Sequence, residues 1–310
     1  MSTSIGLERD GAAPRRRSIN LREHILGYCM VAPPVLFLAV IIVYPALKAI
    51  WDTLAVQHVV LRHGGQVVER TLSLEVYREI WNDPQARQSI AFSLRVTVIT
   101  VIGLFVLCYP IAMYLRFTQS RVASMFRSLC LIPLFIPTII SAYAFISFYQ
   151  QGNFLDVLLQ DAHLESTVFR GQFPQLIDNA TGIVMAQVWN NIPITVLLLG
   201  AGLGEIDNAL IESARDIGAG YPRIFLSILL PLTLRQALIA FALAFIGVLG
   251  SYNIPALLGP TAPQMIGPLM DQDVGLQKLL VAQGLAVITF AFAILVGLLY
   301  VVALARQRGR

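Results

Sequence analysis

Residues able to perform acid–base, metal or nucleotide chemistry are few in this 310-residue sequence. Its four histidines form no recognisable motif, and neither an HExxH sequence nor a pair of carboxylates at catalytic spacing is present. Neither of the two lysines, Lys48 and Lys278, follows a glycine, as a phosphate-binding Gly-Lys-Ser/Thr loop requires. We therefore predict no catalytic residue, no metal site and no nucleotide hydrolysis by such a loop in this chain.

The apolar residues indicate which elements must hold the remaining polar groups. The chain is 56% hydrophobic and 13% charged, whereas soluble domains are about 45–50% apolar and about 25% charged. The apolar residues concentrate in blocks of about 20 residues or more, enough for a helix to cross a bilayer core of about 30 Å. We therefore predict an all-α polytopic membrane protein with six transmembrane helices. The predicted spans are residues 27–50, 89–115, 128–150, 182–203, 231–257 and 279–305.

The distribution of arginine predicts the orientation of these spans. Most of the 22 Lys and Arg residues fall on one side of the membrane if the N-terminus is cytoplasmic, as the positive-inside rule requires. Both termini and the loop 205–231 are then cytoplasmic. The net charge of +4 follows from this topology, so it does not indicate nucleic-acid binding. The predicted parts are a tail at 1–26, a first span with its outer loop at 27–88, a main transmembrane domain at 89–305 and a tail at 306–310.

Two long polar loops, residues 51–88 and 151–181, are predicted on the outer side. Within the first, Ser73 to Trp81 is amphipathic at helical spacing, with Leu74, Tyr77 and Trp81 on one side. Such a helix is expected to lie flat on the outer membrane surface.

All 18 carboxylates fall outside the six predicted spans. Ion-coupled carriers usually keep an ionisable group inside the membrane, so this pattern argues against such a carrier. A carrier that binds its ion through carbonyl and hydroxyl oxygens stays an alternative. A membrane-embedded enzyme and a structural subunit of another complex are further alternatives. The sequence offers no candidate catalytic group within the spans for such an enzyme.

The cytoplasmic segment 205–230 has the pattern of a helix, a turn and a second helix. Asp207 is a suitable N-cap, and Leu210, Ala214 and Ile217 recur at helical spacing. Gly218 fits the left-handed position that ends a helix, and Pro222 fits the first position of the next one. A short, capped helix of this kind suits either docking to a partner or simple connection of two spans.

This segment resembles the "EAA" loop of ABC-importer permeases. That motif consists of E-A-A, three residues, G, nine residues and I-x-L-P. The sequence matches it without gaps at Glu212, Ala214, Gly218, Ile228 and Leu230-Pro231, and departs from it only at Ser213. The resemblance implies a type I ABC-importer permease fold with a cytoplasmic coupling helix, in a family domain that covers roughly residues 89–305.

The resemblance also implies how the loop acts. In such permeases the coupling helix inserts into a cleft of an ATP-hydrolysing subunit, so the importer has two ATP-binding subunits that bind ATP and magnesium. This chain itself would hold no cofactor. The residues implied in the ATPase contact are Glu212, Ser213, Ala214, Arg215, Asp216, Gly218 and Ala219.

Two further stretches, Tyr109 to Phe117 and Ile132 to Leu159, resemble the spermidine/putrescine-type group of these permeases. The implied importer lies in the bacterial inner membrane and contains a second permease chain. A periplasmic or lipid-anchored binding protein would deliver a small organic solute, such as a polyamine or an aminoethylphosphonate.

Polar side chains within the spans are candidates for a translocation pathway, because such groups tend to face a cavity or the protein interior. Hydrogen bonding between helices is the alternative role. Arg95 favours an anionic or zwitterionic solute if it lines the pathway, but its side chain can also extend to the outer surface. The candidates are Arg95, Tyr143, Gln187, Asn190, Asn191, Ser251, Tyr252 and Asn253.

Overall fold

The computed structural model describes residues 21–62, 65–162, 176–259 and 263–308. It separates into two compact units, residues 1–49 and residues 50–310. Residues 1–20 of the predicted N-terminal tail lie outside the described residues, as do positions 163–175 of the second outer loop.

The first unit contains α1 (Leu21–Leu38), a π-helical segment (Ala39–Val43) and most of α2, which runs from Tyr44 to Leu54. Residues Tyr28–Leu54 are long and apolar enough to cross a membrane, with a mean hydropathy of 2.3. This agrees with the first predicted span to within a few residues.

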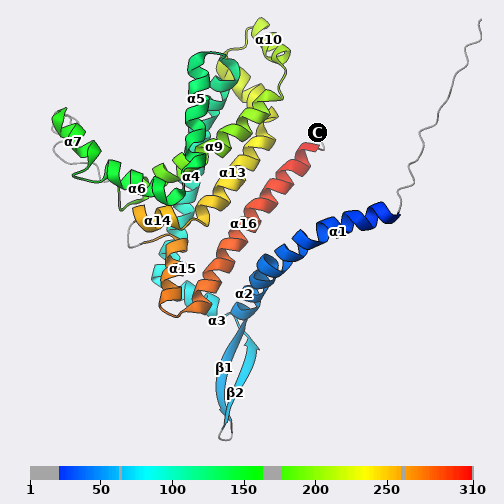
Figure 1. The fold of residues 1–310 in the computed structure, drawn as a ribbon, viewed down its shortest axis with the longest axis vertical. Helices are drawn as coiled ribbons and strands as arrows, with labels where there is room; N and C mark the ends of the chain where they lie inside the picture. Colours follow the sequence, from blue (N-terminus) through cyan, green and yellow to red (C-terminus); the bar gives the residue numbers. More distant parts are fainter. Residues whose placement is uncertain (1–20, 63–64, 163–175, 260–262, 309–310) are drawn as a thin grey trace, which may run out of the picture. The chain divides into compact units, whose positions relative to one another are not determined.

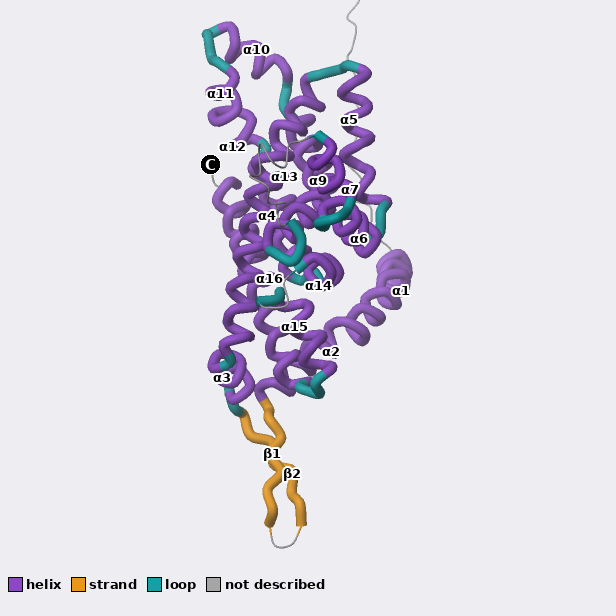
Figure 2. The backbone as a smooth tube through the Cα atoms, turned by 90° about the vertical axis from the view of Figure 1, so that its left-hand side faces the viewer, coloured by secondary structure: helices purple, strands orange, loops and turns teal. Residues whose placement is uncertain are grey.

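The second unit is a bundle of helices with one β-hairpin (Figure 1). Figures 1 and 2 place α5 and α10 toward one end of this unit and α3 and α15 toward the other. Its helices are α3 (Glu75–Asn82), α4 (Pro84–Phe117), α5 (Arg121–Leu131), α6 (Thr138–Tyr149), α7 (Phe154–Asp161), α9 (Ala180–Gly204), α10 (Asn208–Asp216), α11 (Tyr221–Ile224), α12 (Leu230–Leu232), α13 (Leu234–Leu249), α14 (Asn253–Leu258), α15 (Ile266–Gly275) and α16 (Leu279–Arg308).

The β-hairpin consists of β1 (Ala55–Arg62) and β2 (Gly65–Leu72), paired antiparallel from Ala55 opposite Leu72 to Arg62 opposite Gly65. Our prediction of a polar loop over residues 51–88 missed these strands. Two runs rich in valine flank the glycine pair Gly64-Gly65, and this arrangement is typical of a hairpin.

Side-chain caps explain where several helices begin. The Asp83 side chain accepts a hydrogen bond of 2.9 Å from the Gln85 amide at the start of α4. At the start of α9, Asn179 accepts bonds from the Thr181 and Gly182 amides. Each such cap satisfies a backbone N–H that has no partner within the helix, and contributes about 1 kcal/mol.

Six spans were predicted, and the described residues contain four single helices of spanning length and composition, with two bent pairs that bring the total to as many as six. The third span is bent by 109° between Arg121–Phe135 and Thr138–Asp161. Pro133 and Pro137 lie at this break, where proline removes the backbone donor that a continuous helix needs. The fifth is bent by 73° between Leu232 and Leu234.

A stripe of hydroxyl side chains lies buried along α4, at Ser89, Ser93, Thr97 and Thr100. Ser93 Oγ donates to the Ser89 carbonyl and accepts from the Ile266 amide of α15, at 2.7 and 2.8 Å. Small side chains of this kind allow helices to approach closely in a membrane. The bond from the Ile266 amide to Ser93 therefore positions α15 against α4.

The amphipathic segment Ser73 to Trp81 forms a helix, α3, as predicted. Val76 and Ile80 are the buried residues of α3, and they pack with Leu285 of α16 in one apolar cluster. Leu74 and Trp81 are exposed. Val76 and Ile80 thus form the face that packs against α16, and contact of the Leu74 and Trp81 side with the membrane surface stays a prediction.

Candidate functional site

The predicted cytoplasmic loop contains α10, a helix of nine residues that starts after Asp207. The Asp207 side chain accepts a hydrogen bond of 3.0 Å from the Ala209 amide. The predicted N-cap is therefore confirmed.

The turn after α10 has the conformation expected of its glycine. Gly218 has a φ of 82°, in the left-handed region that side chains with a Cβ rarely adopt. The Ala219 amide donates to the Ala214 carbonyl at 3.0 Å, and the Gly218 amide donates to the Arg215 carbonyl at 2.8 Å. These bonds close the C-terminus of α10. Pro222 lies at the second position of α11 rather than the predicted first.

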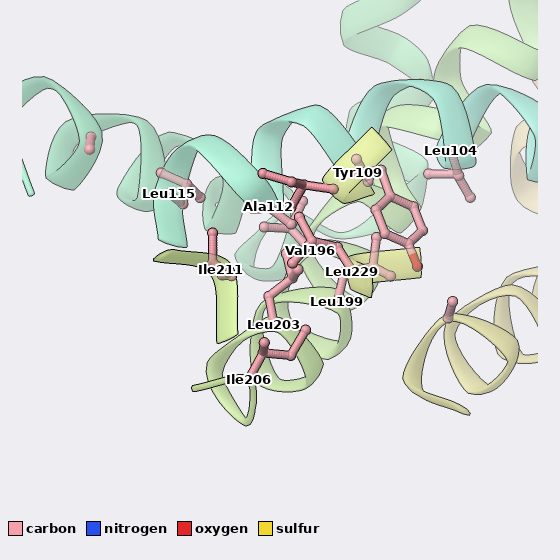
Figure 3. Close-up of a cluster of buried hydrophobic side chains, with 14 of the residues drawn as sticks. Leu104, Tyr109, Ala112, Leu115, Val196, Leu199, Leu203, Ile206, Ile211 and Leu229 are labelled. Atoms are coloured by element: carbon pink, nitrogen blue, oxygen red, sulfur yellow. The ribbon is translucent and has the colours of Figure 1, made fainter. Parts of the chain in front are cut away.

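The two faces of α10 differ in exposure. Ile211 and Ala214 are only 5% and 9% exposed and belong to a cluster with residues of α4, α9 and α13. In Figure 3, Leu203, Ile206 and Ile211 lie together beside Leu115 of α4. Glu212, Ser213, Arg215, Asp216 and Gly218 are exposed, and Ala219 is half-buried.

Thus the loop residues that we predicted as one contact set separate into two groups. The Ala214 side chain faces the chain's own helices, so its role is to pack α10 against the bundle. Glu212, Ser213, Arg215 and Asp216 present polar and charged groups at a surface that also exposes Leu210 and Ile217. Arg215 also lies over the Tyr221 ring, 5.0 Å from its centroid, which braces the turn between α10 and α11.

A cavity of about 410 Å³ lies where α9, α6, α14 and the C-terminal end of α13 meet. Every residue that lines it is uncharged, and the polar ones are amides, hydroxyls and one tyrosine. Six of the eight predicted pathway candidates line this cavity, although they come from two stretches that are distant in sequence. The lining is Pro133, Leu134, Ile136, Thr138, Gln187, Asn190, Asn191, Gly247, Ser251, Tyr252, Asn253 and Ile254.

Hydrogen bonds hold the polar walls of this cavity. The Gln187 amide donates to Ser251 Oγ at 2.6 Å, and the Asn253 amide donates to Thr138 Oγ1 at 3.0 Å. Asn190 and Asn191 donate to carbonyls one turn earlier in α9, which runs through Pro193 without interruption. These bonds use amide N–H groups, and the oxygens of both asparagines accept no bond from the described residues.

An acidic cavity of about 260 Å³ adjoins the uncharged one, and Tyr252 lines both. The Tyr252 hydroxyl donates to an Asp271 carboxylate oxygen at 3.0 Å. Asp271 and Thr138 were not among our candidates, because both lie outside the polar clusters of the predicted spans. Only the packing of α6 and α15 around α14 brings them to the cavities.

Two of our pathway candidates lie elsewhere. Arg95 and Tyr143 are exposed and line neither cavity. Arg95 shares the surface of α4 with the exposed apolar residues Val98 and Ile99, as expected of a side chain that extends from an apolar surface to water. Arg95 thus lies outside both cavities, and its role in a translocation pathway stays a prediction.

One carboxylate is nearer the membrane-spanning segments than the sequence suggested. The second half of the bent third span extends to Asp161 and includes Asp156, which is buried. Asp156 accepts hydrogen bonds from the Gly152 amide at 2.7 Å and from the Gln160 amide at 3.0 Å. Its carboxylate thereby holds the turn between α6 and α7, which is a structural role.

No group of three or more His, Cys, Asp or Glu side chains in the described part of the chain is placed to hold a metal ion.

Comparison with known proteins identifies the family. A family profile described as "Binding-protein-dependent transport system inner membrane component" matches residues 109–308. The spermidine/putrescine permease PotB of Escherichia coli is 24% identical over 206 residues, which cover 66% of this chain and 73% of PotB. The sulfoquinovosyl glycerol permease SmoG of Agrobacterium fabrum is 26% identical over 291 residues, 92% of each protein.

Solved structures agree on the fold. A chain of a bacterial ABC transporter involved in the import of the polysaccharide alginate aligns with a TM-score of 0.70 at 15% identity, over 92% of this chain and 96% of that one. A chain of the inward-facing methionine transporter MetNI aligns with a TM-score of 0.52 at 18% identity, over 73% and 92%. The chain therefore belongs to the binding-protein-dependent transport system inner membrane component family, as a multi-pass permease subunit of an ABC importer with the type I fold, and thus a transport subunit rather than an enzyme.

Proposed function

We propose that this permease pairs with a second permease chain to form the pathway of an importer driven by two ATP-binding subunits. ATP and magnesium bind to those subunits, and α10 docks into a cleft of one of them. A periplasmic or lipid-anchored binding protein delivers the solute from outside. Closure of the ATPases then moves the helices between inward-open and outward-open arrangements.

The observation that carries this proposal is the two-sided character of α10. Its inner face, at Ile211 and Ala214, is buried against the bundle, whereas Glu212 and Asp216 are exposed. A plain connector between spans needs neither a capped helix nor an exposed charged surface. A helix packed on one side, with charged groups and the apolar Leu210 on its exposed side, is suited to bind a partner and to transmit its movement.

We place α10 and both termini on the cytoplasmic side. Arg116, Arg121 and Arg127 flank the turn between α4 and α5, and this turn and α10 lie toward the same end of the second unit (Figures 1 and 2). Cytoplasmic loops are enriched in arginine and lysine. This end is therefore the better candidate for the side on which ATP is hydrolysed.

We propose that the uncharged cavity forms part of the solute pathway. Its free amide oxygens at Asn190 and Asn191 favour a small solute with several O–H or N–H donors. Relatives named for spermidine/putrescine, sulfoquinovosyl glycerol and trehalose/maltose are permeases for solutes of this kind. A cationic solute would in addition meet Asp271 in the adjoining cavity.

The test is charge reversal on the exposed face of α10. When the complex is purified by an affinity tag on this chain, we expect Glu212→Lys to reduce the amount of ATPase subunit that copurifies. We also expect it to abolish ATP-dependent uptake by the complex in proteoliposomes. Uptake would be measured for spermidine, putrescine, trehalose and maltose. Arg121→Glu is the matched control, because it reverses a charge near the same end of the second unit but outside α10.

Normal ATPase recovery and normal uptake by the Glu212→Lys complex would contradict the docking role. Uptake by the purified chain alone, driven by an ion gradient without ATP, would instead support the autonomous carrier.

A further inference from the structure

The root of α10, residues 205–208, is held by a side chain that the loop motif does not contain. Arg116 lies at the end of α4 and is half-buried. Its Nε donates to the Leu203 carbonyl at 3.2 Å, and its Nη2 donates to the Ile206 carbonyl at 3.3 Å and to Asn208 Oδ1 at 2.9 Å. One guanidinium thus contacts the end of α9, the linker and the first residue of α10.

These acceptors suit a cation that cannot lose its proton. Leu203 lies in the last turn of α9, where the helix dipole is negative, and its carbonyl also accepts a long bond of 3.4 Å from the Ile206 amide. Guanidinium has several donors in a fixed plane, so it can satisfy separate acceptors at once, whereas a lysine ammonium is a more compact, less directional donor. The geometry therefore depends on arginine and not only on positive charge.

The opposite side of the root is held by α13. The Gln236 amide donates to a Glu205 carboxylate oxygen at 3.0 Å. A Cβ on Gly202 would lie 2.9 Å from Gln236 Cγ, so the two helices are in close approach there. The linker between α9 and α10 is thus fixed on both sides, from α4 and from α13.

We propose that Arg116 is a positioning residue for energy coupling: it locks the root of α10 to α4 and α9, so that force applied to α10 moves these helices together. This inference rests on the proposed function of α10. Without the lock, α10 would still be folded and exposed, and could bind the ATPase. Its movement would then be taken up by the linker 205–207 rather than passed to the helices that carry the cavity.

The test separates binding of the ATPase from transmission of its movement. Asn191→Cys, with Cys29 and Cys130 replaced by serine, places a reporter thiol in the cavity of the purified importer complex. We measure its reaction with a membrane-impermeant maleimide, with and without ATP and vanadate. We expect a several-fold change in the labelling rate in this parent and less than half of that change in Arg116→Gln, with ATPase recovery unaltered.

Variants of Asn208, which accepts a bond from Arg116, and of the nearby Arg127 distinguish a loss of coupling from a general loss of stability. Asn208→Ala should reduce the ATP-dependent change in labelling rate. Asn208→Asp keeps the acceptor oxygen and should show the change seen in the parent. Asn208→Ala combined with Arg116→Gln should be no worse than Arg116→Gln alone. Arg127→Gln is the matched control: among the described residues, Arg127 donates to the Leu115 carbonyl of the neighbouring helix and to no residue of 205–208, so its loss should leave the response intact.

A full labelling response in Arg116→Gln would overturn the inference. So would equal loss in Arg116→Gln and Arg127→Gln, since that would indicate only general destabilisation of this end. A parent complex that recovers no ATPase, or that shows no response to ATP and vanadate, would contradict the proposed function and the inference with it.

Discussion

The root of α10 and the uncharged cavity are both built from several helices, but they use polar groups in different ways. At the root, Arg116 donates to two backbone carbonyls and to Asn208 Oδ1, and the Gln236 amide N–H donates to Glu205 from another helix, although Gln236 Oε1 has no partner among the described residues. In the cavity, the amide N–H groups of Asn190 and Asn191 bond within their own helix, and their oxygens accept no bond from the described residues. The root is suited to transmit force, and the cavity is suited to accept and release a ligand.

The largest effect that tests this comparison is expected at the wall of the cavity. A Cβ on Gly267 would lie 2.3 Å from the Ser251 carbonyl oxygen, so Gly267→Ala must displace the turn that carries Ser251 and Tyr252. Overpacking of this kind costs about 1–3 kcal/mol. We expect uptake of the four test solutes to fall about tenfold or more, with ATPase recovery retained.

Gly275→Ala is its control, because the added methyl group lies in the same helix, α15, and has open space. Equal uptake by both variants would show that the position of the Ser251 turn does not affect transport.

A smaller effect is expected inside the cavity itself. Asn191→Leu removes a free acceptor without breaking a bond to another helix, so uptake should fall several-fold while ATP hydrolysis persists. Asn191→Asp should shift the preference of the importer toward spermidine over trehalose, because a carboxylate attracts a cation more strongly at low local dielectric constant. Unchanged uptake and preference in both variants would exclude this cavity from the pathway.

A stability effect is expected where α13 begins. Thr233 Oγ1 donates to the Leu229 carbonyl at 2.7 Å and shares a buried hydrogen bond of 2.8 Å with the Tyr109 hydroxyl. Thr233→Val leaves that hydroxyl unpaired, at a cost of about 1–3 kcal/mol. The melting temperature in detergent should fall, and Tyr109→Phe in the same chain should recover much of the loss. A double variant no more stable than Thr233→Val would contradict this pairing.

The smallest effect concerns Asp273 of α15, which is buried. Burial raises the pKa of its carboxyl, as do Asp83 and Glu79, while Lys278 opposes them. The folded chain therefore binds this proton more tightly than the unfolded chain, and stability should decline as the pH rises from about 4, the ordinary Asp range, through the raised pKa. Asp273→Asn should flatten that decline in melting temperature. An identical decline in the unmodified chain and in Asp273→Asn would contradict this role of Asp273. Asp271→Asn is the control, because Asp271 lies at an exposed position in the same helix.

The sequence was most informative where the physical determinants are local. Span length depends on apolar run length, and the start and end of α10 follow from Asp207 and Gly218, whose effects act within a few residues. The determinants of the hairpin β1–β2 are equally local. The glycine pair Gly64-Gly65 between two valine-rich runs indicates a hairpin, and our sequence analysis did not use it. The bends of the third and fifth spans were less accessible, because proline permits a break without fixing its angle.

By itself, therefore, the sequence determined the membrane class, the number of apolar spans and the capped helix of the loop, since composition, periodicity and caps act along the chain. Tertiary structure alone decided which polar residues share a cavity, which face of α3 is buried and which side chain holds the root of α10. Arg116 and Asn208 are 92 positions apart. Their contact depends on how α4 and α9 pack, and residue types along one chain do not specify that packing.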